Sequence, residues 1–291
     1  MGEQTYEELV EPYRRELHLH CYRMLGSVTD ADDVLQEILL AAWRGLDSFK
    51  GRASLRTWLY RIATNRCLNA IRDGKRRPPA EPLPPFEPPE PSRRGDVTWL
   101  QPYPDALLDE LLVRRETIQL AFITALQRMP PRQAAALILV EVLDFPVAEA
   151  ADLLDTTPTA VKGALQRARA SVRTPAAPRD AKTERRVAER FAEAFMADDI
   201  ATITTLLTDD AWLAMPPAPH EYVGPSAIAA FLEASASARI STLVLEPAGA
   251  NLHPAYSCYF VNGSHRTDTG QLVLTVSGDR ISTITRFLKP L

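Results

Sequence analysis

The first quarter of the chain repeats apolar positions at the spacing of amphipathic α-helices. Thr29 and Asp30 are candidate caps for one such stretch, and acidic residues fill its first turn, where they favour the positive end of a helix dipole. This pattern predicts a helix over 29–46. The run FKGRAS at 49–54 interrupts the pattern, and a second strong helix is predicted over 55–73. An all-α domain is therefore expected here.

A proline-rich stretch separates this domain from a second group of predicted helices. Residues 78–104 hold 10 of the 24 prolines, which predicts an extended, partly polyproline-like segment. Beyond it the pattern predicts helices over 107–128 and 132–143, and then helix, tight turn and helix over 145–173. A second spacer, TPAAPRD, follows at 174–180.

The proline-rich stretch contains residues that a passive tether does not need. Trp99, Leu100 and Tyr103 are large and apolar, and burying such a side chain contributes roughly 1.5–3 kcal/mol. We expect them to anchor the tether to a folded surface, either the C-terminal domain or its contact with a helical domain. Docking on a partner protein is the alternative.

The unit at 145–173 has the pattern of a helix-turn-helix. Thr157 is a candidate N-cap, Pro158 suits the first helical position, and Asp155 tolerates the left-handed conformation that such turns often need. Opposite an apolar stripe, the second helix carries a polar and basic stripe of Lys162, Gln166, Arg169 and Arg173. A short turn before a basic helix favours DNA binding, and an ordinary helical hairpin is the alternative.

From residue 182 onward the pattern changes to helices followed by strands. Helices are predicted over 183–199 and 224–236. Short β-type runs predict strands at 240–246, 255–261, 271–277 and 280–287. The run SGDR is a hairpin turn between the last two strands. This order predicts an α+β domain.

Composition limits the class of protein. The 291 residues, 46% of them hydrophobic, suffice for two or three domains. Cys21, Cys67 and Cys258 are far apart and lack the spacing of metal ligands, which is typical of a reducing compartment. The chain shows no signal peptide and no long apolar run, so we expect a soluble, cytoplasmic protein without membrane attachment.

Charge is distributed unevenly along the chain, although the net charge is only −4. Residues 1–43 carry 3 Lys and Arg against 9 Asp and Glu, residues 44–77 carry 10 against 2, and residues 78–112 carry 2 against 7. Such alternation indicates separate surfaces for separate partners.

The basic segment includes a polar helix face. Spacings of four, four and three residues place Arg61, Asn65, Asn69 and Arg72 on one side of the helix, opposite its apolar side. Arg and Asn side chains bind phosphates and base edges, so this face is a candidate DNA surface. A solvated basic face is the alternative.

Together these segments resemble a known family. The strings TWLYRIATN and AVKGALQRAR, in this order and spacing, resemble the two conserved domains of extracytoplasmic-function sigma factors, the promoter-recognition subunits of bacterial RNA polymerase. The resemblance implies sigma region 2 at 5–77, a Pro-rich linker at 78–106 and sigma region 4 at 107–173. Residues 182–291 resemble a SnoaL-like domain, and WLQPYPD resembles the linker motif of sigma factors that carry one. The implied fold is multidomain: two all-α domains followed by an α+β SnoaL-like cone.

The resemblance also implies roles for individual residues. Docking on the clamp helices of the polymerase is implied for Asp33, Gln36 and Glu37. Opening and reading of the minus-ten element is implied for Arg56, Arg61, Asn65, Asn69 and Arg72. Recognition of the minus-thirty-five element is implied for Lys162, Gln166, Arg167 and Arg169. Gly163 stands where some relatives carry a base-contacting residue. The acidic linker matches the segment that threads through the polymerase toward the RNA exit path.

The C-terminal domain is expected to modulate the activity of the rest of the chain. Some SnoaL-like cones use His and Asp as acid and base, but the candidates here form no motif: His220, His253, His265 and Asp268. A set of large side chains either lines a cavity or, as we favour, forms the core: Trp212, Met215, Tyr222, Tyr256 and Phe287. We expect no catalytic residue, no metal and no cofactor.

Core RNA polymerase and promoter DNA are the expected partners, and a small ligand or an anti-sigma protein is a further candidate. The alternative function is a SnoaL-like enzyme or ligand-binding domain fused to a helix-turn-helix repressor. A repressor needs no DNA-melting helix, so the basic segment 44–77 favours a sigma factor that starts transcription.

Overall fold

The structure is a computed structural model that describes residues 6–51, 53–74, 86–94, 100–108, 115–172, 180–216 and 218–289. The chain divides into two compact units. The helical unit comprises residues 1–77 and 107–174, and the cone unit comprises 78–106 and 175–291. The proline-rich linker therefore groups with the C-terminal domain.

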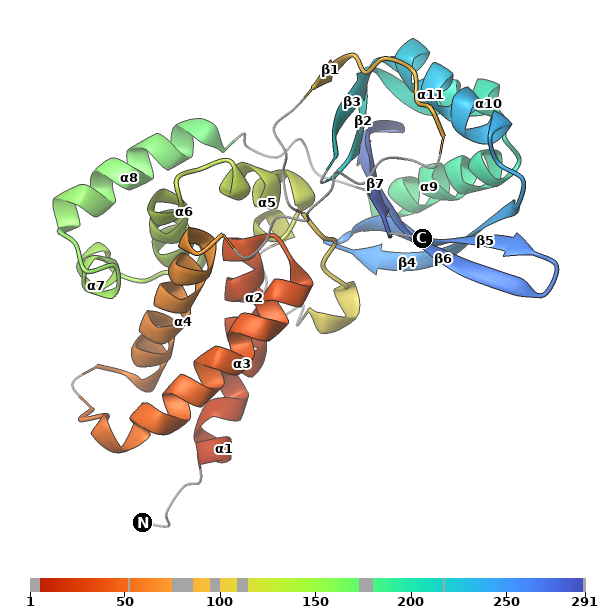
Figure 1. Cartoon of the computed structure of the whole chain (residues 1–291). Coiled ribbons are helices and arrows are strands. Elements are labelled where there is room, and N and C mark those ends of the chain that lie inside the picture. The colour runs from red at the N-terminus through yellow and green to blue at the C-terminus, as the bar shows by residue number, and fades with distance from the viewer. Residues whose placement is uncertain are drawn as a thin grey trace. The chain divides into compact units, whose positions relative to one another are not determined.

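The first part of the helical unit is a packed group of helices, drawn in red and orange in Figure 1. Its elements are α1 (Tyr6–Val10), η1 (Glu11–Tyr13), α2 (Arg14–Leu25), α3 (Val28–Gly45), η2 (Leu46–Ser48) and α4 (Leu55–Arg72). Ser27 caps α3, because its side-chain oxygen accepts a hydrogen bond from the Asp30 N–H at 3.1 Å. The predicted caps Thr29 and Asp30 instead lie inside the first turn. Ser54 caps α4 in the same way.

The second part of the helical unit contains shorter helices. Its elements are η4 (Arg115–Thr117), α5 (Leu120–Gln127), α6 (Pro131–Leu137), the π-helical turn η5 (Ile138–Val142), α7 (Val147–Leu153) and α8 (Pro158–Ser171). The predicted single helix over 107–128 is wrong, since α5 begins only at Leu120. Just before α5, both the carbonyl and the hydroxyl of Thr117 accept hydrogen bonds from Arg23.

The helix-turn-helix prediction is confirmed in α7 and α8. The Thr157 side chain accepts a hydrogen bond from the Ala160 N–H at 3.2 Å and caps α8, with Pro158 at its first position. Asp155 adopts a left-handed conformation with φ +47° in the turn. The apolar face of α8 is buried through Val161, Leu165 and Ala168.

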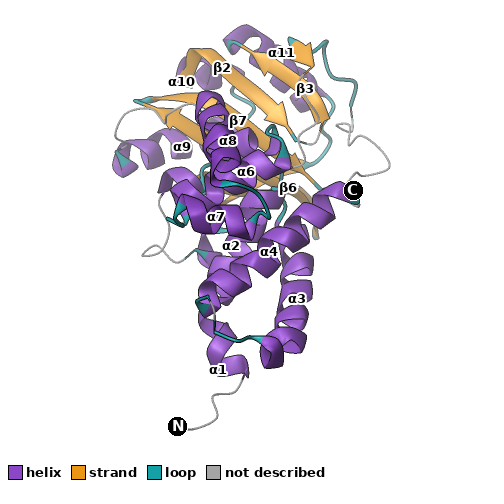
Figure 2. Ribbon diagram, turned by 90° about the vertical axis from the view of Figure 1, so that its left-hand side faces the viewer, coloured by secondary structure: helices purple, strands orange, loops and turns teal. Residues whose placement is uncertain are grey.

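The two parts of the helical unit pack directly on each other. Helix α4 contacts α6 and α7, and α2 contacts α5 and α6. Figures 1 and 2 show this arrangement from two sides. We call it the closed arrangement, because it brings the start of α4 against the helices that precede α8.

The cone unit is built on one seven-stranded sheet with the order β1-β3-β2-β7-β6-β5-β4. Its strands are β1 (Arg93–Arg94), β2 (Leu207–Met215), β3 (Ala218–Val223), β4 (Thr242–Ala250), β5 (His253–Asn262), β6 (His265–Ser277) and β7 (Arg280–Leu288). All neighbours are antiparallel except β2 and β7. The four predicted strands are present, whereas β1, β2 and β3 were not predicted.

Helices fill one side of this sheet, as Figure 1 shows for α9 and α11. They are α9 (Ala181–Met196), α10 (Ile200–Leu206) and α11 (Pro225–Ser237). Phe191 of α9 and Ile228 of α11 join Leu213 and Leu274 of the sheet in one apolar core. Helices packed on a mixed, curved sheet form the α+β cone that was predicted.

The linker is part of the cone unit through two attachments. Its residues Arg93 and Arg94 form the edge strand β1 beside β3. Farther along, Leu100 and Tyr103 are buried. The Tyr103 N–H donates a hydrogen bond to the side-chain oxygen of Asn251 in the β4–β5 turn at 2.8 Å, and the Asn251 N–H donates to the Tyr103 carbonyl at 2.9 Å. Trp99, the third expected anchor, lies outside the described residues.

Candidate polymerase and promoter interface

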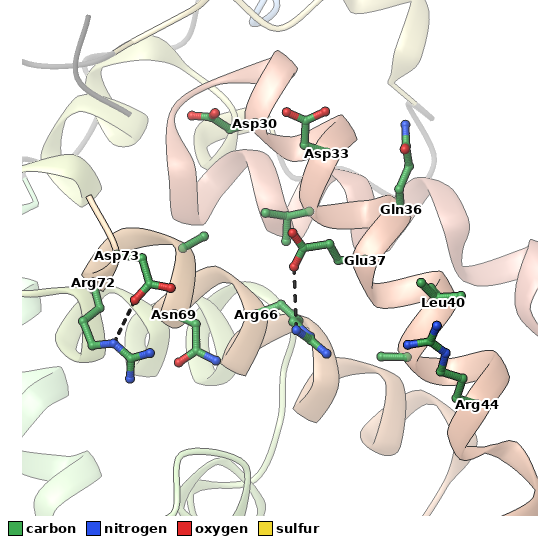
Figure 3. Close-up of a pocket in the computed structure, with 13 residues that line it drawn as sticks. Asp30, Asp33, Gln36, Glu37, Leu40, Arg44, Arg66, Asn69, Arg72 and Asp73 are labelled. Carbon is green, nitrogen blue, oxygen red and sulfur yellow. Dashed lines mark hydrogen bonds and ion pairs between the residues drawn. The ribbon is translucent and has the colours of Figure 1, made fainter. Parts of the chain in front are cut away.

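A groove of about 960 Å³ runs between α3 and α4. Figure 3 shows its two walls. Asp33, Gln36 and Glu37 project from α3, and Asn69 and Arg72 project from α4. The structure thus brings the three residues expected to bind polymerase next to two of those expected to bind promoter DNA.

The groove is electrostatically divided. Glu37 on the α3 wall forms an ion pair with Arg66 on the α4 wall at 3.7 Å, and Arg72 pairs with its neighbour Asp73 at 3.1 Å. All four side chains are at least 45% exposed. Exposed pairs of this kind contribute about 0–1 kcal/mol, so they exchange readily for the charges of a partner.

The beginning of α4 contacts the second part of the helical unit. The Thr57 hydroxyl donates a hydrogen bond to the Glu149 carboxylate of α7, and the Arg61 guanidinium donates to the Asp152 carbonyl at 3.1 Å. The Arg56 guanidinium lies over the rings of Tyr60 and Phe145, at 4.9 and 4.8 Å from their centres. In the closed arrangement, Arg56 and Arg61 are therefore engaged within the chain.

A buried contact that the sequence did not indicate joins the two parts nearby. Arg23 of α2 is almost completely buried and donates to the Thr117 carbonyl at 3.1 Å and to its hydroxyl at 2.8 Å. Gln127 of α5 donates to the Arg23 carbonyl at 3.1 Å. Arg23 stands in α2 with no motif around it, so only the tertiary structure reveals its partners.

The core beneath α4 contains a neutral histidine. Burial, together with the nearby charges of Arg23 and Arg56, lowers the pKa of His20 to about 3. The His20 ring lies 3.0 Å from the Thr64 hydroxyl and packs edge-on against Tyr60. His20 is thus a polar part of the core between α2 and α4.

The outer face of α8 is open to solvent. Lys162, Gln166 and Arg169 of the predicted stripe are exposed, and so is Arg167. Arg169 is paired with Glu141 at 2.6 Å. Arg173, which extends the predicted stripe, lies outside the described residues.

The candidate acid–base residues of the cone are dispersed. His253 begins β5, whereas His265 pairs with the last residue of that strand, Asn262. Nine steps along a strand separate these ends by about 30 Å. Within the described ranges no group of three or more His, Cys, Asp or Glu side chains has the arrangement of a metal site.

The large side chains of the cone divide between two faces. Met215, Tyr222 and Tyr256 belong to the apolar core, and burial raises the pKa of Tyr256 to about 12, with Glu189 and Glu193 adding to the effect. Trp212 is half-buried beside Arg93. The interpretation of these side chains as core residues thus holds for Met215, Tyr222 and Tyr256.

A capped helix-turn-helix with an exposed basic face is typical of a DNA-binding protein. Comparison with known proteins identifies the family. Residues 9–77 match Sigma-70 region 2, and residues 119–172 match Sigma-70, region 4. Over 299 positions the chain is 40% identical to the ECF RNA polymerase sigma factor SigG of Mycobacterium tuberculosis, which covers 96% of this chain and 80% of SigG. The chain belongs to the extracytoplasmic-function sigma factors.

Other relatives share the helical domains or the whole architecture. ECF RNA polymerase sigma factor SigM of Mycobacterium tuberculosis is 33% identical, covering 57% of this chain and 74% of SigM. The crystal structure of Mycobacterium tuberculosis extracytoplasmic function sigma factor SigJ superposes with a TM-score of 0.64 at 23% identity, over 96% of this chain and 95% of SigJ. The full succession of helical domains and cone therefore has a known counterpart.

One structural finding bears on membranes. In the part of the chain that the structure describes, every helix is too short or too polar to cross a bilayer.

Proposed function

We propose that this sigma factor guides core RNA polymerase to promoters through three separate surfaces. Asp33, Gln36 and Glu37 bind the polymerase, the polar face of α4 opens and reads the minus-ten element, and the exposed face of α8 reads the minus-thirty-five element. The groove between α3 and α4 is the observation that carries the proposal, because one concave surface combines an acidic wall with a basic wall. An initiation factor has to bind polymerase and melted DNA at neighbouring surfaces, and the two walls of this groove provide such surfaces.

The closed arrangement is the free form of the factor in this proposal. Its contacts engage Arg56, Thr57 and Arg61 at the start of α4, where the minus-ten element is to be bound. Polymerase has to separate the two helical domains before α4 and α8 can reach elements spaced along a promoter. A partner shifts such an equilibrium only by its different affinity for the two states.

The cone is proposed to modulate this opening and to have no catalytic activity. The dispersal of His253, His265 and Asp268 supports a non-catalytic role. The linker attachments support regulation, since Leu100 and Tyr103 are buried within the cone unit and tie it to the chain that leads into sigma region 4. The protein is expected to act in the cytoplasm, where its polymerase is.

Run-off transcription with core RNA polymerase tests the main proposal. A promoter-dependent transcript is expected with the wild-type chain, and Glu37→Ala should weaken polymerase binding about tenfold without changing DNA preference. Glu189→Ala on α9 is a matched exposed control that should behave as wild type. DNA binding without any promoter-dependent transcript would instead favour the helix-turn-helix repressor.

A further inference from the structure

The linker completes the sheet of the cone. Strand β3 pairs with β2 on one side, and on the other side it pairs with β1, which comes from the linker more than a hundred residues earlier in the sequence. Arg93 stands opposite Glu221, and Arg94 stands opposite His220. An open sheet edge is a template for an added strand, and here the chain supplies that strand itself.

Side chains on both partners fix the segment 86–94, which we call the strap. The Phe86 ring packs 5.5 Å from Phe231 of α11, which in turn lies 4.7 Å from the Tyr222 ring. The Tyr222 hydroxyl donates a hydrogen bond to the Pro89 carbonyl at 2.8 Å. The Val223 N–H donates to the Ser92 hydroxyl oxygen at 3.0 Å. The strap is thus held along its whole length.

Charge adds to this recognition. Glu221 is 6% exposed, and its carboxylate accepts a hydrogen bond from the Arg93 guanidinium. The same guanidinium lies over the indole ring of Trp212, 5.1 Å from its centre. A buried carboxylate is costly unless a cation and hydrogen bonds compensate it. The strap therefore supplies a cation that the folded edge of the cone can use.

We propose that the β3 edge, together with the aromatic side chains of Tyr222 and Phe231, is a peptide-binding surface that retains the sigma linker. Its occupant is the strap, an extended proline-rich segment with an aromatic residue at one end and an arginine at the other. Because one segment cannot pair with β3 and thread through the polymerase at the same time, the cone competes with polymerase for the linker. This inference rests on the proposed function and names the contact through which the cone acts.

An engineered disulfide tests the competition. Directly opposed residues of antiparallel strands have Cα atoms about 4.5–5.5 Å apart, which suits a disulfide. Arg93→Cys combined with Glu221→Cys should therefore lock the strap on β3, while the natural cysteines are buried thiols and stay unpaired. We expect the oxidised double variant to lose transcription at least tenfold relative to its reduced form. Reductant should restore it, and neither single variant should respond to the oxidant.

The outcomes separate the inference from the proposed function. A locked form that transcribes as well as the reduced form would refute competition for the linker, and so would failure of the disulfide to form. If the wild-type chain and the reduced variant both gave no promoter-dependent transcript, the sigma function itself would be wrong.

A substitution at Phe86 tests the binding of the strap to β3 without introducing cysteine. Phe86→Ala should increase hydrogen–deuterium exchange of the β3 amides, while Phe86→Leu, which keeps most of the apolar volume, should increase it less. Unchanged β3 exchange in Phe86→Ala would count against the strap.

Discussion

The hydrogen bond between Thr57 and Glu149 allows a direct measurement of how the closed arrangement limits polymerase binding. Glu149 lies on α7, half-exposed, and Thr57 is buried at the start of α4. Glu149→Ala removes the carboxylate and leaves both helices intact, because alanine is a strong helix former. The Thr57 hydroxyl keeps a local partner, since it also lies 2.7 Å from the Ser54 hydroxyl. The variant therefore weakens closure without leaving Thr57 unpaired.

The size of the effect follows from the geometry. A hydrogen bond to a charged group contributes roughly 1.5–3 kcal/mol, and the partial exposure of Glu149 places it at the lower end. Since 1.4 kcal/mol corresponds to a factor of ten, the opening equilibrium should shift about tenfold toward the open form. Where the closed form dominates, the apparent affinity for polymerase rises by up to the same factor.

Titration of labelled chain with core RNA polymerase measures this affinity, and small-angle scattering of the free chain measures its size. Glu149→Ala should bind more tightly and have a larger radius of gyration. Glu149→Gln keeps an oxygen acceptor and should show a smaller change. Unchanged or weaker polymerase binding, with the fold and melting temperature preserved, would show that this contact does not oppose polymerase.

Further predictions concern the DNA surface, the buried histidine and the linker. Arg167→Ala should cost roughly 1–3 kcal/mol in binding and relax preference at one position of the minus-thirty-five element; equal weakening on all sequences in competition binding would make Arg167 a phosphate contact. Because burial holds the pKa of His20 near 3, the unfolded chain binds a proton below about pH 6.5 that the folded chain does not. The contribution of His20 to the free energy of unfolding is therefore fully present above that pH and decreases as the pH falls toward 3. Denaturant unfolding at about pH 7 and pH 5 should show a smaller fall for His20→Gln, and an equal fall would contradict this assignment. Tyr103→Ala empties a site that is 1% exposed and should destabilise the cone unit by about 3 kcal/mol; an unchanged melting temperature would show that Tyr103 contributes little.

Local signals in the sequence were sufficient for much of the helical unit. The cap at Thr157 and the left-handed turn at Asp155 depend on residues within a few positions of each other, so side-chain chemistry predicts them directly. The apolar face of α4 through Leu59, Ala63 and Cys67 follows from helical periodicity and is buried. The family resemblance assigned roles to Asp33, Gln36, Glu37, Asn69 and Arg72, but their grouping in one groove was not predicted, because it depends on how α3 packs against α4.

Contacts between distant segments were not predictable in the same way. The residues before α5 contact Arg23, which is nearly a hundred residues away from Thr117 in sequence, and such tertiary hydrogen bonds can override local propensity. Strand β1 has only two residues in a segment rich in proline, which gives no periodic signal. Prolines confine a strand to a sheet edge, which is where β1 lies, but the sequence does not indicate which edge. Phe86 was therefore missed as an anchor, while Leu100 and Tyr103 were noticed by their size.

The contacts of the closed arrangement and those of the strap differ in how easily contacts with a partner can replace them. In the closed arrangement, Arg61 donates to a neutral backbone carbonyl and is itself exposed. A DNA phosphate offers a charged acceptor, and charge-assisted hydrogen bonds are roughly twice as strong as neutral ones, so promoter DNA can replace this contact at little cost. Arg93 is different, because its acceptor is a buried carboxylate and its face is covered by an indole ring. Removing the strap from the cone takes a cation away from a buried carboxylate, so the Arg93 contact is expected to be more costly to break than the Arg61 contact.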